Sequence, residues 1–210
     1  MTGLEFNILD GRPETHAAVP SLAFRLRIQS PMPVHAVLLH CRVQIEPRRR
    51  SHSPAEQERL AGMFGEPSRW PDTLQPLVWT RTTLSVPSFD ESAELDVPVP
   101  CTYDFDVVSA AYLQSIEAGE IPLLFLFSGT VFAKTVHGFA VEQIAWDKEA
   151  SYRMPVQVWR ALMESYFPGT TWIRLRHETL DTLQRFRARR GLLSWDETID
   201  ALAARKAAAS

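Results

Sequence analysis

Strict alternation of apolar and polar side chains in two early segments constrains the fold of this chain more than any other feature. In residues 22–28 (LAFRLRI) every second side chain is large and apolar, and two of the positions between them are arginines. In residues 34–45 (VHAVLLHCRVQI) the same pattern places His40, Arg42 and Gln44 on one face. Successive side chains of a strand point to opposite faces of a sheet, so a period of two predicts strands with one buried face.

Further segments carry a strand pattern, namely 4–9, 78–86, 93–103, 121–133 and 139–146. Residues 122–133 (PLLFLFSGTVFA) are apolar on both faces, which predicts a central strand that is covered on both sides. Gly129 inside this run indicates a bulge or a close approach of two backbones. About seven short strands at this spacing are typical of a sandwich.

Two helices are predicted to interrupt the strands. The segment Ser53-Pro54-Ala55-Glu56 has the form of a capping box with proline at the first helical position. That helix should run to Phe64 and end at Gly65. A second inserted helix is predicted over residues 107–118, with Asp106 as its N-cap.

From about residue 151 the apolar pattern acquires a helical period. Helices are predicted after Pro155, over 177–190 and after Ser194, where a second capping box stands. The last helix should fray into an Ala- and Lys-rich tail from about residue 205.

The predicted fold class is therefore α+β, mainly an antiparallel β-sandwich of about seven strands with inserted helices and a C-terminal helical segment. We expect residues 1–150 to form the sandwich domain with its two inserted helices. Residues 151–210 should form the helical segment and pack on the sandwich, because their apolar stripe needs a cover.

Charge is distributed unevenly over the chain, whose formal net charge is −3. Residues 1–150 carry 12 Lys and Arg against 19 Asp and Glu, whereas residues 151–210 carry 10 against 6. An acidic chain is a poor candidate for nucleic-acid binding, which needs a basic surface. The longest apolar run, 121–127, is far shorter than the roughly 20 residues of a membrane-spanning helix. With no signal-peptide pattern at the start, we expect a cytoplasmic protein that does not insert into membranes.

The sequence lacks the familiar catalytic and metal-binding motifs, such as GxSxG, the Walker A loop, GxGxxG and HExxH. Cys41 and Cys101 fall on predicted core faces, so we expect buried, reduced thiols without a metal ion. Asp104 and Asp106 lie one strand repeat apart, about 7 Å, which is compatible with acid–base chemistry. The simpler interpretation is a helix cap at Asp106 and a solvated Asp104. We therefore predict no catalytic residue, no metal and no cofactor, with a hydrolase that uses the two aspartates as the remaining enzymatic alternative.

A basic run stands just before the predicted helix start at Ser53. Arg48, Arg49 and Arg50 place three cations near backbone N–H donors, an arrangement that can hold an anion. Runs of this kind are more often solvated loops. We therefore predict an anion site at these four residues only as an alternative function.

A second group of arginines lies at the end of the predicted helix over 177–190. Only two acidic side chains share that helix, so its charge is not neutralised within the helix. Either the acidic sandwich or a partner protein should cover it. The predicted partner-binding residues are these arginines together with an aromatic side chain before the helix: Arg185, Arg187, Arg189, Arg190 and Trp172.

Six longer segments have a recognisable sequence: IEPRRR (45–50), FGEPSRWPDTLQPLVWT (64–80), CTYDFDV (101–107), IPLLFLFSGTVF (121–132), YRMPVQVWRALMESYFPGTTWIRLR (152–176) and TLDTLQRFRARRG (179–191). Together they resemble a bacterial family of unknown function that is encoded beside actinobacterial-type nickel–iron hydrogenases. The resemblance covers residues from about 20 to about 200 and assigns no catalytic residues. It implies an accessory role in the assembly, maturation or regulation of such a hydrogenase.

The expected function is thus that of a non-catalytic accessory protein that acts through protein–protein contacts. The expected partner is a hydrogenase subunit or another maturation protein. A small-molecule or anion-binding module, built in the sandwich interior or at Arg48–Arg50, is the alternative. An exposed apolar patch near Trp172 would favour the first function, and a deep pocket with convergent polar groups would favour the second.

Overall fold

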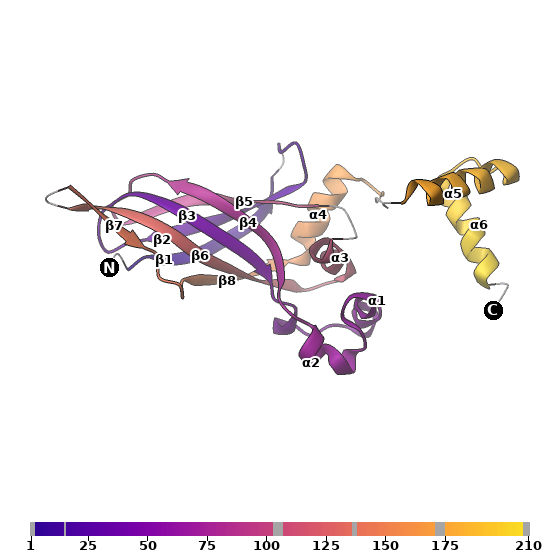
Figure 1. Ribbon diagram of the computed structural model, residues 1–210, viewed down its shortest axis with the longest axis horizontal. Coiled ribbons are helices and arrows are strands. Elements are labelled where there is room, and N and C mark those ends of the chain that lie inside the picture. The colour runs from indigo at the N-terminus through magenta and orange to yellow at the C-terminus, as the bar shows by residue number, and fades with distance from the viewer. Residues whose placement is uncertain (1–2, 15, 103–106, 136–137, 171–174, 208–210) are drawn as a thin grey trace. The chain divides into compact units, whose positions relative to one another are not determined.

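Two antiparallel sheets form the main part of the molecule (Figure 1). The computed structural model describes residues 3–14, 16–102, 107–135, 138–170 and 175–207. The strands are β1 (Glu5–Pro13), β2 (Ser21–Gln29), β3 (Val34–Ile45), β4 (Leu77–Val86), β5 (Ser92–Pro100), β6 (Glu120–Thr135), β7 (Gly138–Gln143) and β8 (Glu149–Pro155). The helices are α1 (Pro54–Phe64), α2 (Trp70–Thr73), α3 (Val108–Ser115), α4 (Val156–Tyr166), α5 (His177–Arg190) and α6 (Trp195–Ala207), with short 3-10 turns η1 (Pro47–Arg49) and η2 (Pro67–Arg69).

The strands pair in two separate groups within the described residues. A three-stranded sheet has the order β1-β2-β5, and a five-stranded sheet has the order β4-β3-β6, with β7 and β8 both paired to β6. Every pairing of these strands is antiparallel. The predicted α+β fold, dominated by an antiparallel sandwich, is therefore confirmed.

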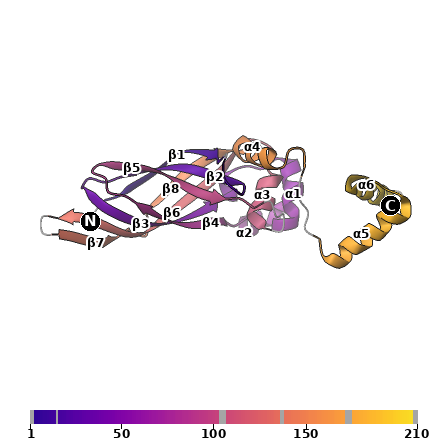
Figure 2. The same ribbon diagram turned by 90° about the horizontal axis from the view of Figure 1, so that it is seen from above.

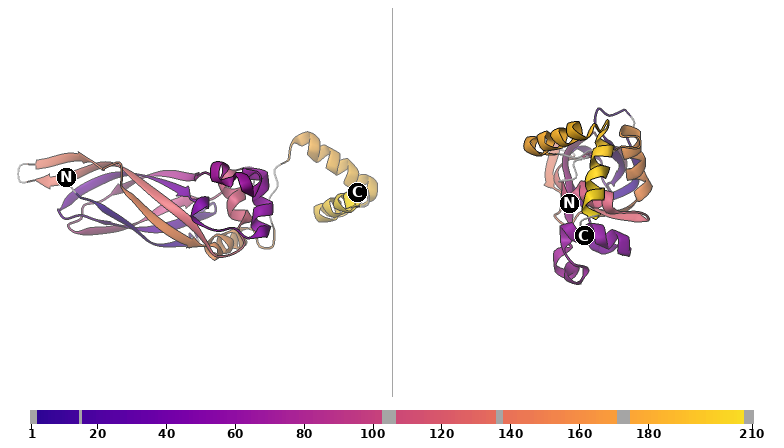
Figure 3. Two further views of the ribbon diagram at one scale, coloured as in Figure 1. Left: turned by 90° about the horizontal axis from the view of Figure 1, so that it is seen from below. Right: turned by 90° about the vertical axis from the view of Figure 1, so that its right-hand side faces the viewer.

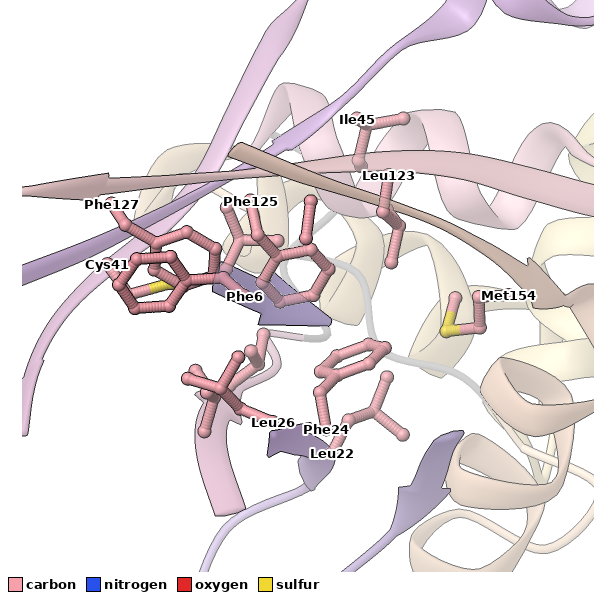
Figure 4. Packing of buried hydrophobic residues seen from close by; sticks show 14 of the residues in the cluster. Phe6, Leu22, Phe24, Leu26, Cys41, Ile45, Leu123, Phe125, Phe127 and Met154 are labelled. Carbon is pink, nitrogen blue, oxygen red and sulfur yellow. The ribbon is translucent and has the colours of Figure 1, made fainter. Parts of the chain in front are cut away.

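The core lies between the two sheets, with β2 supplying a central side chain (Figure 4). Phe24 is fully buried, and its ring centroid lies 5.2 Å from that of Phe125 and 5.9 Å from that of Tyr152, both edge-on. Farther along the sandwich the rings of Phe6 and Phe127 stack at 4.3 Å. Edge-on and stacked pairs of this kind contribute about 0.5–1.5 kcal/mol each beyond the burial of the rings. These pairs join β1 and β2 of one sheet to β6 and β8 of the other.

The segments with strict alternation form β2 and β3, as predicted. In β3 the predicted inner face, which includes Leu39 and Cys41, is buried, and His40 on the other face is exposed. Cys41 and Cys101 are both buried and free. Burial raises the pKa of each thiol to about 12, so both thiols stay protonated at neutral pH.

β6 is the central strand of its sheet, and it changes partner halfway along. Its first half pairs with β8 and its second half with β7. Gly129, near the change of partner, has a φ of +139°, and a Cβ there would lie 2.0 Å from the carbonyl oxygen of Leu38. The close backbone approach predicted for Gly129 is confirmed.

The strand β8 corrects one prediction. The sequence pattern predicts helix from about residue 151, and this is wrong for residues 151–155, which complete β8. Ala150 and Met154 are buried by the sandwich, and the exposed Ser151 and Arg153 alternate with them. Pairing with β6 overrides the local helical spacing, and α4 begins directly after Pro155.

The inserted helices lie together at one end of the sandwich, opposite the β6–β7 hairpin (Figures 2 and 3). α1 has the predicted capping box, in which Ser53 Oγ accepts the N–H of Glu56 and the Glu56 side chain accepts the N–H of Ser53. α3 is shorter than predicted, and Val107 occupies its N-cap position without a side-chain cap. The predicted cap Asp106 lies outside the described residues.

The chain divides into two compact units, Met1–Trp172 and Ile173–Ser210. The first contains both sheets and α1–α4, and the second contains α5 and α6. Helix α4 is part of the sandwich core, because Trp159 and Leu162 are buried and the ring of Trp159 lies 6.3 Å from that of Trp79. For α5 and α6, the expected packing on the sandwich stays a prediction.

Replacing Gly129 by alanine should destabilise the sandwich by about 3 kcal/mol or more, because the new Cβ meets a backbone oxygen and the residue has a positive φ. The midpoint of urea denaturation measures this loss. Gly62→Ala in α1 is the matched control, since a Cβ there meets nothing within 4 Å. The control should leave stability unchanged or raise it by up to about 1 kcal/mol. Equal midpoints for the two variants would contradict the tight approach at Gly129.

Truncation at two positions tests which C-terminal residues belong to the sandwich core. A fragment of residues 1–150 lacks four large core side chains, Met154, Val156, Trp159 and Leu162, each of which contributes about 1.5–3 kcal/mol of burial. That loss is comparable with the whole stability of a domain, so the fragment should be insoluble or molten. A fragment of residues 1–172 should melt cooperatively, as near-ultraviolet circular dichroism would show. A cooperatively melting 1–150 fragment would contradict this assignment.

Candidate functional site

The hairpin of α5 and α6 carries the four arginines that the sequence predicts as partner-binding residues. α5 ends at Gly191 in the left-handed conformation, where its N–H donates to carbonyl groups of the last turn. α6 begins after Ser194, whose Oγ accepts the N–H of Glu197 at 3.1 Å. The Glu197 carboxylate accepts the N–H of Leu193 at 2.8 Å, so the predicted capping box is present with its second bond shifted by one residue.

Contacts within this hairpin leave much of its own apolar surface uncovered. No residue of α5 is fully buried. Leu193 in the turn is 88% exposed, and Ile199 and Leu202 of α6 are 47% and 37% exposed. A helical unit of this size is too small to bury a large core of its own. Uncovered leucine and isoleucine side chains on one small unit are typical of a protein-binding surface.

Two of the four arginines are held by aromatic rings. The guanidinium carbon of Arg187 lies 4.4 Å from the ring centroid of Trp195, and that of Arg190 lies 5.1 Å from the ring centroid of Phe186. Such cation–π contacts contribute about 0.5–1 kcal/mol at exposed sites. The sequence analysis does not identify Trp195 as a site residue. The helix end at Gly191 is the signal that could have revealed it, because the turn there places Trp195 beside Arg187.

The other two arginines extend toward solvent. Arg185 is exposed and donates to a backbone carbonyl of the preceding turn at 3.3 Å, and Arg189 is exposed as well. The unit Ile173–Ser210 carries eight Lys and Arg against five Asp and Glu, so its positive charge is not neutralised internally. Trp172, the fifth predicted partner-binding residue, lies outside the described residues.

The residues predicted as an anion site have separate partners. Arg48 donates to a backbone carbonyl of α2, Arg49 to a serine hydroxyl of β8 at 3.3 Å, and Arg50 to the carboxylate of Glu56. Ser53 acts as the N-cap of α1. Arg48 and Arg50 line the same hollow of about 470 Å³, whereas Arg49 and Ser53 do not line it. Anion binding in this hollow stays a prediction.

Glu56 supplies the anion that Arg50 binds. Both carboxylate oxygens lie 3.0 Å from Nη2 of Arg50, and backbone N–H groups of Ser53 and Glu117 donate to them at 3.0 and 2.9 Å. Burial by itself would raise the pKa of Glu56, but these donors stabilise the carboxylate and hold the pKa below its ordinary value of 4.5. Through these contacts Glu56 connects α1 to the loop before it and to the segment after α3.

Replacing Glu56 by glutamine should lower the unfolding free energy by about 3 kcal/mol at neutral pH, because it leaves Arg50 buried without a counter-charge. The folded-state pKa of Glu56 is depressed, so its stabilisation is complete above pH 4.5 and is lost as the pH falls through the folded-state pKa. Urea denaturation should therefore show that the difference in unfolding free energy between wild type and variant becomes smaller as the pH falls.

Glu117→Gln is the matched control for this substitution. It removes the same charge from an exposed ion pair with Arg59 and keeps the backbone N–H that Glu56 accepts. Exposed pairs contribute only about 0–1 kcal/mol, so the control should unfold almost like the wild type at either pH. Similar losses in both variants would contradict the central place of Glu56.

The remaining sequence candidates are a pair of aspartates and a metal site. Asp104 and Asp106 lie outside the described residues, so the hydrolase alternative stays a prediction. In the part of the chain that the structure describes, no three His, Cys, Asp or Glu side chains lie close enough together to hold a metal ion. None of the described helices is both long enough and apolar enough to cross a membrane.

Several solved structures show a weak likeness to this chain. A β-glucosidase from Kluyveromyces marxianus in complex with glucose matches at 10% identity with a TM-score of 0.27, over 73% of this chain and 15% of that enzyme. The CARDB domain of the PF1109 protein from Pyrococcus furiosus, in complex with di-metal ions, matches at 9% identity with a TM-score of 0.28, over 73% of this chain and 92% of that domain. β-Glucosidase 3B from Thermotoga neapolitana in complex with glycerol matches at 12% identity with a TM-score of 0.26, over 72% of this chain and 17% of that enzyme. Likenesses at these TM-scores support no conclusion about this chain.

No curated protein sequence matches the chain. A family model, described as a family of unknown function (DUF6084), matches residues 1–210. Because the match extends over every residue of the sequence, the chain belongs to this family of unknown function.

Proposed function

We propose that this protein is a non-catalytic accessory protein that binds a partner protein through the α5–α6 hairpin. The observation that carries the proposal is the combination of uncovered apolar side chains with excess positive charge on one small unit. Apolar side chains such as Leu193 and Ile199 supply affinity when a partner buries them. Arg185 and Arg189 are exposed, so their guanidinium groups can meet carboxylates of the partner.

The partner surface that fits this hairpin is acidic with an apolar centre. Charged groups at the rim of an interface mainly raise the association rate and select the partner, whereas buried apolar groups slow dissociation. Binding should therefore weaken as salt concentration rises, because salt screens exposed charges beyond about 8–10 Å.

We place this contact in the assembly, maturation or regulation of a nickel–iron hydrogenase, with a hydrogenase subunit or another maturation protein as the partner. The support is the resemblance carried by the six longer segments, which is an association and assigns no chemistry. A reducing cytoplasm is the setting that we propose, since free thiols such as Cys41 and Cys101 persist there.

Arg185→Glu combined with Arg189→Glu should abolish partner binding without affecting the fold, since both side chains are exposed and neither guanidinium lies on an aromatic ring of the described residues. The full-length protein, tagged at its N-terminus, is purified from its natural host, and co-purified proteins are identified by mass spectrometry. We expect a hydrogenase component with the wild type, its loss by about tenfold or more with the double variant, and an unchanged melting temperature.

Arg69→Glu combined with Arg153→Glu is the matched control, because it makes the same charge change at exposed positions of the first unit. It should retain the partner. If Arg185→Glu/Arg189→Glu still binds the partner, the interface lies elsewhere. If that variant unfolds, the two arginines stabilise the fold and do not serve binding. Salt-sensitive capture of an unrelated protein would keep the interface and overturn the hydrogenase assignment.

A further inference from the structure

A groove of about 980 Å³ lies on the outer face of the five-stranded sheet, away from the sandwich core. The groove runs over β3 and β6, where Leu126 and Ser128 line it. β4 borders it on one side, and residues 146–149, which lead from β7 into β8, border it on the other. It belongs to the first unit and is independent of the hairpin proposed above.

Two arginines face each other across one side of this groove. Arg42 of β3 and Arg81 of β4 are direct cross-strand partners, so their side chains share the outer face of the sheet. Among the described residues, neither guanidinium forms an ion pair. Like charges directly opposite each other destabilise a sheet by a few tenths of a kcal/mol up to about 1 kcal/mol.

The other sheet shows how this chain normally arranges such charges. Arg27 of β2 lies directly opposite Glu94 of β5 and forms an ion pair with it at 2.7 Å. Arg25 lies directly opposite Asp96, at 3.3 Å. Unlike charges thus meet across β2 and β5, whereas no ion pair neutralises Arg42 or Arg81 within the described residues. A ligand that brings a carboxylate would provide a counter-charge.

The opposite side of the groove carries an aromatic ring and two acids. Trp146, in the turn before β8, is 93% exposed, which leaves almost its entire indole ring uncovered. Asp147 and Glu149 follow it and line the groove as well. A ligand that is purely anionic would meet these two carboxylates, so the groove favours a ligand with one negative and one positive group.

The spacing of these groups defines the ligand further. Strand pairing places Arg81, Arg42, Leu126 and Glu149 in one row across the sheet. Neighbouring strands are about 4.8 Å apart, so the midpoint of the arginine pair lies about 12 Å from Glu149. In an extended segment, residues i, i+2 and i+4 share a face, and i and i+4 are about 13 Å apart.

We propose that this groove binds an extended segment of a partner protein with the pattern acid-x-apolar-x-base. The acidic side chain meets Arg42 and Arg81, the apolar side chain lies on Leu126 beside the ring of Trp146, and the basic side chain meets Glu149. Charge complementarity at both ends selects the segment, and the uncovered indole supplies apolar contact area.

The test uses the immobilised full-length protein and a library of acetylated, amidated pentapeptides. Glu and Lys occupy the two ends in either order, an apolar residue is in the middle, and the other positions vary. Parallel libraries carry Gln in place of Glu or in place of Lys. We expect the wild type to enrich the doubly charged peptides by about tenfold over both Gln libraries. Arg42→Gln combined with Arg81→Gln should abolish that enrichment, and Trp146→Ala should weaken it several-fold.

Arg25→Gln combined with Arg27→Gln, on the other sheet, is the matched control and should leave the enrichment intact. The melting temperature of Arg42→Gln/Arg81→Gln at low salt should equal or exceed that of the wild type, because the like-charge pair is gone. A lower melting temperature would show that the arginines support the sheet instead. Absence of enrichment, equal binding of peptides that carry only Glu, or full binding by the double variant would each overturn the proposal.

Discussion

Contact between the two sheets through aromatic rings is the interaction on which the rest of the structure depends. The ring of Phe24 meets Trp79 of β4, Phe125 of β6 and Tyr152 of β8, and Trp79 in turn meets Trp159 of α4. Truncation of one buried phenylalanine to alanine costs about 3–5 kcal/mol, a large part of the stability of a typical domain. Because these rings pack in the space between the sheets, charged strand side chains such as Arg42 and Arg81 lie on the outer face of their sheet.

The sequence predicts this sandwich well wherever an apolar pattern is long. A period of two over seven or more residues fits a half-buried strand and little else, so β2 and β3 are predicted to within a residue. β8 is missed because its alternation, through Ala150, Tyr152 and Met154, is short and continues without a break into the helix at Val156. Only its pairing with β6 makes this segment a strand, and pairing between distant segments is not encoded in local spacing.

The contacts of the site residues are likewise of two kinds, those formed by neighbours in the sequence and those formed by distant segments. The helix caps at Ser53 and Ser194 are readable because donor and acceptor lie within a few residues. Binding of Arg50 by Glu56 follows from that cap, but the second N–H donor, Glu117, is 61 residues away and gives no sequence signal. The pairing of Arg42 with Arg81 likewise depends on strand register. A shift of one residue would move one of the two side chains to the other face of the sheet.

The small size of the α5–α6 hairpin limits the kind of contact that it makes. Over residues 177–190 and 195–204, where burial is described, no apolar side chain of its helices is fully buried, so packing within the hairpin contributes little free energy to their order. When a partner orders a helical unit on binding, the ordering consumes about 2–5 kcal/mol of the gross binding energy. We therefore expect the net affinity of the proposed contact to be lower than its buried area suggests, with faster dissociation. An exchangeable contact of this strength suits the proposed accessory role, in which the protein must leave its partner once assembly is complete.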